Sequence, residues 1–162
     1  MENKIMENNM KLEFDAKSQN ESLARLAVAA FLTETDPTIE ELNDIKTAVS
    51  EAVTNSIIHG YNEGPGKVSM KCRLTNKIYE KKDNTYCVNS LIEIQIKDEG
   101  VGIKDIEKAR EPLFTTKPEL ERSGMGFMFM EMFMDKVDVQ SEPGVGTVVI
   151  MKKKLKKVKK QV

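Results

Sequence analysis

Two side chains on one predicted helix could act together on a ligand. Glu51 and Asn55 are four residues apart, so on a helix their carboxylate and carboxamide project from one face. That face also carries Ala48, Thr54 and Ile58 and no lysine, which is unusual for a solvated surface. For Glu51 alone, a solvated helix position would be the simpler explanation. The pair on this background indicates a functional site.

Two glycine-containing runs are further candidates. In DEGVG, residues 98–102, a carboxylate ends a predicted strand and two glycines let the backbone turn closely around a ligand. The alternative is a plain Asp-containing turn. In RSGMG, residues 122–126, a predicted helix begins where free amide groups and the helix dipole favour a phosphate. An ordinary helix-initiating turn would look similar. Together with the first pair, these runs could line one pocket.

Common nucleotide-binding fingerprints are excluded. A Rossmann motif would need glycine where the chain has Asp105 or Phe129. A Walker loop ending at residues 66–67 would need glycine at Tyr61 and a hydroxyl residue at Val68. A nucleotide site in this chain must therefore be built in another way.

Three helices are predicted to position these groups. The first covers residues 18–34 and has these apolar residues at helical spacing: Leu23, Leu26, Ala27, Ala30 and Phe31. The second begins at a capping box formed by Thr38 and Glu41 and runs to His59, before Gly60. Its predicted core stripe is Leu42, Ile45, Val49, Val53 and Ile57. The third begins at residues 123–126 and carries Met128, Phe129, Met132 and Phe133 toward Asp135.

Strands are predicted in the remainder of the chain. Residues 91–97 alternate polar side chains with isoleucines, residues 68–74 resemble a partner strand, and residues 137–140 and 147–151 form a closing hairpin. The polar stretch 75–90 is interpreted as a protruding, peripheral hairpin. Because strands and helices come in blocks, the fold class is α+β, a two-layer sandwich with a mixed, largely antiparallel sheet.

Composition indicates one soluble domain, over residues 1–151. The chain has 162 residues, 40% hydrophobic and 31% charged, and too few histidines and cysteines for a His/Cys zinc site without carboxylates. A polar amino terminus and the absence of a long apolar run predict a cytoplasmic protein with reduced thiols, although a Cys72–Cys87 disulfide stays possible. Seven lysines in residues 152–162 form a basic tail on an acidic body. We expect this tail to be disordered; contact with nucleic acid or anionic lipid is the alternative.

Several separated motifs resemble the boxes of the GHKL ATPase superfamily, which includes DNA gyrase, a heat-shock chaperone, histidine kinases and a mismatch-repair ATPase. These are EAVTN at 51–55, DEGVG at 98–102, GMG at 124–126 and GT at 146–147. The longer strings SQNESLAR, EAVTNSIIHGY and PLFTTKPELERSGMGF are similar to the anti-sigma F family, serine kinases of spore-forming bacteria. The resemblance covers about residues 10–150. It implies a Bergerat-type ATP-binding fold with helices on one face of the sheet.

The resemblance also implies roles for particular residues. Asn55 would ligate the magnesium ion that bridges the ATP phosphates, and Glu51 would be the general base toward the substrate serine. Asp98 would accept a hydrogen bond from the adenine amino group. The residues implied around the adenine ring are Thr147, Gly100 and Gly102.

Residues 111–123 match the mobile ATP lid of the family. Arg122 is the candidate for contacting the γ-phosphate. The other implied phosphate contacts are Thr115, Thr116, Lys117, Ser123, Gly124, Met125 and Gly126. A solvated loop is the alternative that polarity alone would suggest.

The implied partners are a sporulation sigma factor of the sigma F type, facing Glu21 and Arg25, and an anti-anti-sigma protein as phosphorylation substrate. Glu21 and Arg25 would equally fit a helix-stabilising ion pair. A homodimer is implied, for which the sheet edge at residues 11–16 is available, and no membrane or direct DNA binding is expected.

Three functions compete on this basis. The leading hypothesis is an anti-sigma factor with Mg-ATP-dependent serine kinase activity. The first alternative is a non-catalytic switch in which ATP only controls sigma binding. The second is the catalytic domain of a histidine kinase, which would want a phosphoacceptor helix pair before residue 10.

Overall fold

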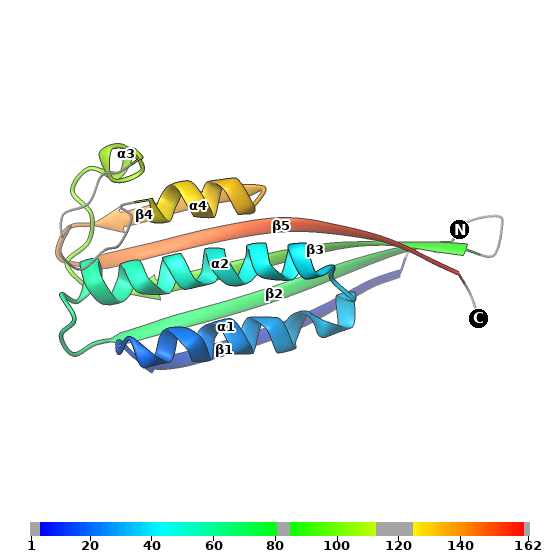
Figure 1. The fold of residues 1–162 in the computed structure, drawn as a ribbon, viewed down its shortest axis with the longest axis horizontal. Coiled ribbons are helices and arrows are strands. Elements are labelled where there is room, and N and C mark those ends of the chain that lie inside the picture. Colours follow the sequence, from blue (N-terminus) through cyan, green and yellow to red (C-terminus); the bar gives the residue numbers. More distant parts are fainter. Residues whose placement is uncertain (1–3, 81–84, 113–124, 161–162) are drawn as a thin grey trace.

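The computed structural model describes residues 4–80, 85–112 and 125–160. The elements, in chain order, are β1 Lys4–Asp15, α1 Gln19–Phe31, η1 Leu32–Thr35, α2 Ile39–Asn55, η2 Ser56–Gly60, β2 Lys67–Glu80, β3 Thr85–Asp98, α3 Ile106–Ala109, α4 Gly126–Phe133, β4 Lys136–Glu142 and β5 Gly146–Lys160 (Figure 1). The η1 segment is a 3₁₀ turn and η2 is a π-helical turn that continues α2.

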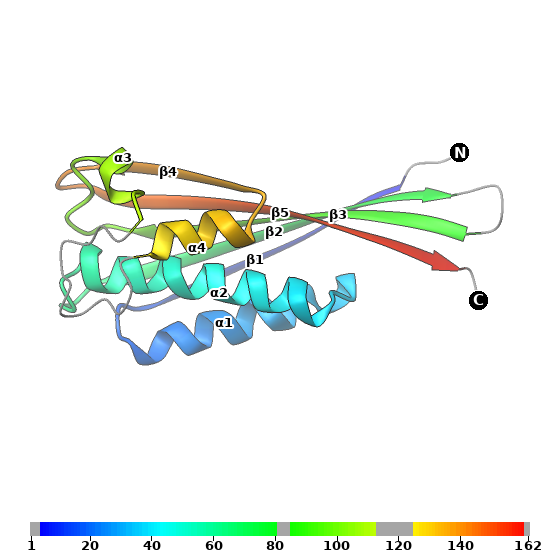
Figure 2. The same cartoon turned by 45° about the horizontal axis from the view of Figure 1, so that its top comes forward.

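The strands form one sheet in the order β1-β2-β3-β5-β4, and each of its pairings is antiparallel. The helices α1, α2 and α4 lie on one face of this sheet (Figure 2). The predicted α+β two-layer architecture is therefore confirmed. The expected mixture of parallel and antiparallel strands is wrong, because every pairing in the described residues is antiparallel.

The core lies between α2 and the middle of the sheet. Ile92, Ile94 and Ile96 alternate along β3 and are buried on the helix side. The predicted stripe of α2 meets them, with Ile45, Val49 and Val53 buried. Side chains return to the same face every 2 residues on a strand and every 3.6 residues on a helix, so each element buries one face. This packing fixes α2 against the sheet and leaves its remaining faces for α1 and α4.

The amino-terminal end of α2 has the predicted capping box. The Thr38 hydroxyl accepts a hydrogen bond from the Glu41 amide at 3.1 Å, and the Glu41 carboxylate accepts one from the Thr38 amide at 2.8 Å. Two otherwise unpaired backbone donors are satisfied in this way.

The core faces of two helices differ from the prediction. In α1 the buried residues are Ala24 and Val28, whereas Leu23 and Leu26 are 45% and 67% exposed. In α4 the buried residues include Phe127 and Met130, outside the predicted set, because this helix lies against α2 on that side. Small side chains let α1 approach its neighbours closely. The stripe predicted from helical spacing on α1 is thus right only in part, since Ala27 and Phe31 pack against the core but Leu23 and Leu26 do not.

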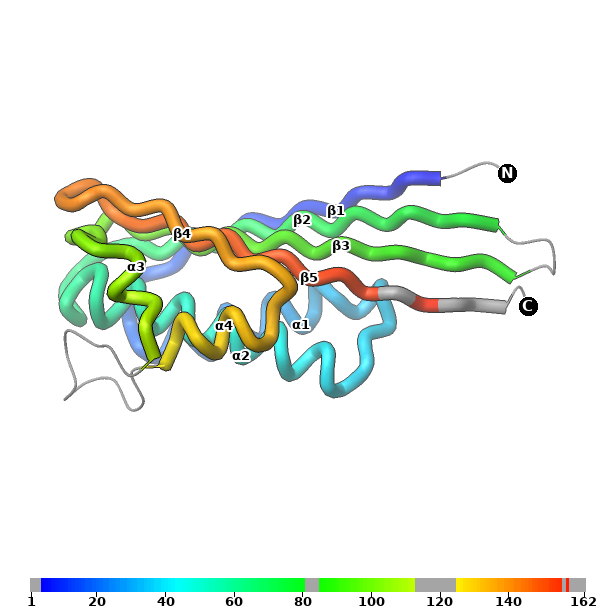
Figure 3. Tube along the Cα trace, turned by 90° about the horizontal axis from the view of Figure 1, so that it is seen from above, coloured from blue at the N-terminus to red at the C-terminus, as the bar shows by residue number. Residues whose placement is uncertain are grey.

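The lysine-rich segment is a strand, so its predicted disorder is wrong for residues 152–160. β5 pairs with β3 along its whole length, from Thr147 opposite Asp98 to Lys160 opposite Thr85. Residues 75–80 lengthen β2 and residues 85–90 lengthen β3, and this gives the lysine-rich segment a partner strand. The two features together extend the sheet beyond the helices (Figure 3).

Several lysines of this strand pair with acidic residues of the body. Lys152 lies 3.0 Å from Glu93, and Lys157 lies 2.8 Å from Glu41. Ion pairs therefore hold the lysine-rich segment against the acidic body of the protein.

The two thiols are free and buried. Cys72 lies opposite Ile94 and Cys87 opposite Tyr79 in the β2–β3 ladder, so the thiols are seven residues apart along it. A disulfide is impossible at this separation, since bridged Cα atoms lie less than about 7 Å apart. Burial also raises the pKa of the Cys72 thiol to about 12.

Among the described residues, no helix has both the length and the apolar character needed to cross a membrane.

Candidate functional site

A cavity of about 450 Å³ opens where the end of α2, the η2 turn, the end of β3 and the start of α4 meet. It is lined by Ala52, Asn55, Ser56, His59, Gly60, Asn62, Asp98, Val101, Gly102, Ile103, Lys104, Asp105, Ala109, Glu111, Gly126, Phe127, Met128, Thr147 and Val149. Five of the predicted site residues are among them: Asn55, Asp98, Gly102, Gly126 and Thr147. The sequence-based expectation of one shared pocket is confirmed for these residues.

Asp98 ends β3 as a buried carboxylate. It is 4% exposed, and it accepts hydrogen bonds from the Gly100 amide at 3.0 Å, the Ser56 hydroxyl and the Thr147 amide. Burial raises the pKa of Asp98 above its ordinary value, and the three hydrogen bonds offset only part of this effect. A buried carboxylate that still faces a cavity is suited to accept a hydrogen bond from a polar ligand.

The turn after Asp98 depends on glycine at two positions. A Cβ atom on Gly100 would lie 2.2 Å from the Gly60 carbonyl oxygen, so the η2 turn and this turn touch through backbone alone. Gly102 has φ +74°, a conformation that other residues rarely adopt. Gly102 lines the cavity, whereas Gly100 lets the turn approach Gly60.

Two hydroxyl groups fix the same turn and were not found from the sequence. Tyr61 donates a hydrogen bond to the Lys67 carbonyl at 2.6 Å and accepts one from the Glu99 amide at 2.7 Å. Ser141 accepts one from the Ile103 amide at 2.7 Å. Both side chains connect segments distant in sequence, so local spacing carries no signal for them.

Glu51 and Asn55 point toward the start of α4. A Cβ atom on Gly126 would lie 3.1 Å from Glu51 Oε2 and 3.2 Å from Asn55 Oδ1. A larger residue there would require both side chains to shift by a few tenths of an ångström. The carboxylate and the amide therefore meet at the first residue of α4, where backbone amides lack intrahelical partners.

The polar groups at this point fit a hydrated metal ion and phosphates. The amide oxygen of Asn55 and the carboxylate of Glu51 are hard oxygen ligands, of the kind that Mg²⁺ accepts when substrate phosphates complete its shell. In the described part of the chain, no group of three His, Cys, Asp or Glu side chains could hold a metal alone. Asn55 and Glu51 alone would leave most positions of a magnesium shell to water and phosphate oxygens.

The π-helical turn η2 forms one wall of the cavity. It follows Asn55 directly and brings Ser56 to Asp98 and Gly60 to Gly100. Single π turns within helices are rare and often occur at functional sites. His59, one turn after Asn55, also lines the cavity and could have been found by extending the i, i+4 spacing.

Several predicted contacts lie outside the described residues: Thr115, Thr116, Lys117, Arg122, Ser123 and Gly124. Most of the predicted lid, residues 111–123, falls in the same gap. Met125 directly precedes α4, and Glu111 lines the cavity. The two ends of the segment therefore flank the site.

The predicted partner-binding pair lies away from the cavity. α1 packs on α2, and α2 lies between α1 and α4 (Figure 2). Arg25 Nε lies 2.9 Å from Glu21 Oε1, which also accepts a hydrogen bond from the Ser50 hydroxyl. The helix-stabilising ion pair, which was the alternative to partner binding, is thus present. Glu21 is also hydrogen-bonded to α2 through Ser50.

Comparison with known proteins identifies the class of this chain. Residues 14–153 match the family described as "Histidine kinase-like ATPase domain". The chain belongs to this family, and its antiparallel sheet covered by helices on one face is a Bergerat-type ATPase fold.

Within the family, the chain is similar to proteins named "Anti-sigma F factor". It is 57% identical to that of Oceanobacillus iheyensis and 54% identical to that of Geobacillus kaustophilus, each over 95% of this chain and 97% of the relative. It is 55% identical to that of Clostridium perfringens strain SM101, over 93% of this chain and 99% of the relative. The likeness therefore extends over nearly the full length of each protein.

Proposed function

We propose that this chain is a sigma F anti-sigma factor that uses Mg-ATP to phosphorylate a serine of its anti-anti-sigma antagonist. The observation that carries this proposal is the meeting of Glu51 and Asn55 with Gly126 beside a cavity that ends at Asp98. A base, a metal ligand and a glycine-led helix start lie at one end, and a buried hydrogen-bond acceptor lies at the other. This arrangement matches a nucleotide with its phosphates at α4 and its adenine ring at β3.

At the adenine end, Asp98 accepts a hydrogen bond from the amino group of the base. Its carboxylate is held by Gly100, Ser56 and Thr147, so it cannot turn away from the cavity. Gly102 brings the backbone against the ring. Because an acceptor recognises an amino group and not a carbonyl, this arrangement favours adenine over hypoxanthine.

At the phosphate end, Asn55 holds magnesium through its amide oxygen, and the metal supplies charge neutralisation at the phosphates. The backbone amides at the start of α4 bind phosphate oxygens. Glu51 accepts the proton of the substrate serine hydroxyl as the serine oxygen attacks the γ-phosphorus; the bond from that phosphorus to the β,γ-bridging oxygen breaks, and ADP leaves. Arg122 and the lid residues Thr115, Thr116, Lys117 and Ser123 contact the phosphates from the segment that enters α4.

The regulatory part of the proposal is partner exchange. Sigma is bound in the ATP state through the α1 surface around Glu21 and Arg25, and the antagonist traps the ADP state. ATP and ADP must then each bind the sigma complex and the antagonist complex with different affinity, since a ligand shifts an equilibrium only by its difference in affinity for the two states. We further propose a cytoplasmic homodimer joined along β1, which is an edge strand of the sheet.

Incubation with γ-labelled ATP, magnesium and a candidate anti-anti-sigma protein tests the kinase proposal. We expect label on a serine of that protein, dependent on magnesium. Tight ATP binding and sigma binding without label would show instead a non-catalytic ATP-dependent switch. Label on a histidine would contradict both.

A further inference from the structure

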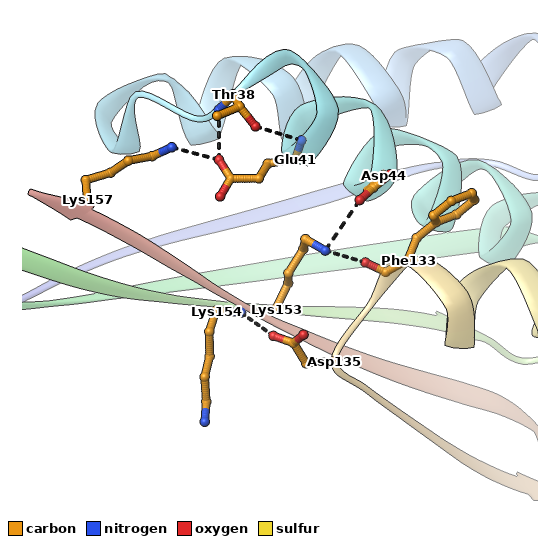
Figure 4. Close-up of polar contacts among 8 residues, drawn as sticks. All are labelled: Thr38, Glu41, Asp44, Phe133, Asp135, Lys153, Lys154 and Lys157. Atoms are coloured by element: carbon orange, nitrogen blue, oxygen red, sulfur yellow. Dashed lines mark hydrogen bonds and ion pairs between the residues drawn. The ribbon is translucent and has the colours of Figure 1, made fainter.

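One lysine of the β5 extension joins both helices that form the phosphate end of the site. Lys153 Nζ donates a hydrogen bond to the Phe133 carbonyl at 2.6 Å and lies 3.5 Å from Asp44 Oδ2 (Figure 4). Phe133 is the last residue of α4, and Asp44 is on the first half of α2. The ammonium group therefore bridges the two helices from the sheet.

The surroundings of Lys153 indicate a specific contact. Its side chain is only 15% exposed, and a buried ammonium is costly unless it is paired and hydrogen-bonded. The final carbonyls of a helix lack intrahelical partners and carry its negative dipole end. The last turn of α4 itself contains no basic residue. Lys153 thus supplies, from another element, the cation that this helix end lacks.

The other end of α4 makes the close contact described above. Gly126 is its first residue, and it approaches Glu51 and Asn55 so closely that a Cβ atom would lie 3.1 Å from the Glu51 carboxylate. A helix of eight residues is a short rod about 12 Å long. If Lys153 released the carboxyl end of this rod, α4 could slide or tilt along α2. The gap at Gly126 would change as a result.

We propose that Lys153 is a positioning residue for the proposed nucleotide site: it ties the end of α4 to α2 and so sets the distance between the Gly126 turn and the Glu51–Asn55 pair. This role rests on the proposed function, because it concerns the binding of the triphosphate. The lysine-rich segment, which as a sequence suggests only a basic tail, therefore contributes to the site through the fold.

The chain offers two matched controls on the same strand. Lys154 points to the opposite face of the sheet in Figure 4, is exposed, and its backbone amide, not its side chain, binds Asp135. Lys157 also pairs with α2, through Glu41, but it reaches the amino-terminal end of that helix and not α4. Lys157→Met therefore removes an ion pair to α2 while leaving the α4 contact intact.

The test is calorimetric titration of the full chain with a non-hydrolysable Mg-ATP analogue and, separately, with adenosine. We expect Lys153→Met to weaken binding of the analogue about tenfold or more, because the start of α4, which would bind the phosphates, is then no longer held in place against Glu51 and Asn55. Adenosine affinity should stay within about twofold, since Asp98 and its turn are not touched. Lys153→Arg should restore most of the analogue affinity, and Lys154→Met and Lys157→Met should bind like the wild type.

The outcomes separate the inference from the proposed function. Wild-type affinity for the analogue in Lys153→Met, or equal losses for the analogue and adenosine, would overturn the positioning role alone. Failure of the wild-type protein to bind the analogue at all would overturn both. If Lys153→Met does not fold, Asp44→Asn replaces it, with a smaller loss expected for the analogue only. Unchanged binding in that variant would contradict the bridge.

Discussion

At the scale of single residues, the proposal distinguishes binding the triphosphate from transferring its terminal phosphate. Glu51 and Asn55 both reach Gly126 but carry different groups. The amide oxygen of Asn55 has no proton-accepting role at neutral pH, whereas the carboxylate of Glu51 can take a proton. Their substitutions should therefore affect different steps.

Glu51→Gln should strongly slow phosphoryl transfer while retaining nucleotide binding. The loss of a positioned general base lowers transfer about 10²- to 10⁴-fold. ATP affinity should stay within about threefold, because glutamine has nearly the same shape. Single-turnover transfer and equilibrium binding measure the two effects. The control is Glu40→Gln, an exposed carboxylate on the same helix. Wild-type transfer rates in Glu51→Gln would remove the base assignment.

Asp98→Asn should change the preferred base of the nucleotide. The three groups that donate to Asp98 require an oxygen acceptor, so an amide NH₂ must turn toward the ligand or leave one donor unpaired. Affinity for ATP should fall about tenfold or more, and the ratio of ATP to ITP affinity should fall with it, since an NH₂ group can donate to the carbonyl of hypoxanthine. Competition binding measures both; Asp138→Asn, on a partly exposed ion pair of β4, is the control. An unchanged ratio would contradict base recognition by Asp98.

At the scale of elements, the start of α2 joins a capping box to the lysine-rich strand. Glu41 binds both the Thr38 amide and the Lys157 ammonium (Figure 4). Burial raises the pKa of Glu41, but the hydrogen bonds from Lys157 and Thr38 outweigh this and leave the pKa below its usual value. This contribution to stability is present above the unfolded-state pKa and is lost as pH falls through the lower folded-state pKa.

Glu41→Gln should therefore lower the free energy of unfolding at pH 7, by about 1 kcal/mol or less because the pair is partly exposed. The difference from the wild type should shrink as pH falls below 4. Urea unfolding at several pH values measures this. Glu40→Gln, the adjacent exposed residue, should show little difference at any pH. A constant difference between Glu41→Gln and the wild type would mean that the charge of Glu41 is not involved.

Elements with strong local signals could be predicted from the sequence. The α2 capping box, the alternating isoleucines of β3 and the glycine turn at Gly102 each depend on residues close together in the chain. The core face of α1 was predicted only in part, because the fully buried residues are Ala24 and Val28, whereas the larger Leu23 and Leu26 are exposed. The sequence did not predict how far β3 and β5 extend, because their pairing is set by residues distant in the chain.

At the scale of the whole molecule, one cavity is assembled from segments across more than 90 residues of chain. The sequence predicted that Asn55, Asp98, Gly126 and Thr147 belong together, and they line the same cavity. It did not predict Tyr61, Ser141 or Lys153, whose partners are far away in sequence. Residues that contact a ligand form recognisable motifs, whereas residues that hold those motifs in place are visible only in the fold.

The most direct test of the proposed site is a crystal structure of this chain with magnesium and a non-hydrolysable ATP analogue. The proposal predicts a magnesium ion about 2.1 Å from Asn55 Oδ1 and bound to phosphate oxygens. It also predicts the Glu51 carboxylate beside the γ-phosphate and the adenine amino group within hydrogen-bonding distance of Asp98. A nucleotide bound outside the cavity, or a metal ion held without Asn55, would contradict the proposed site.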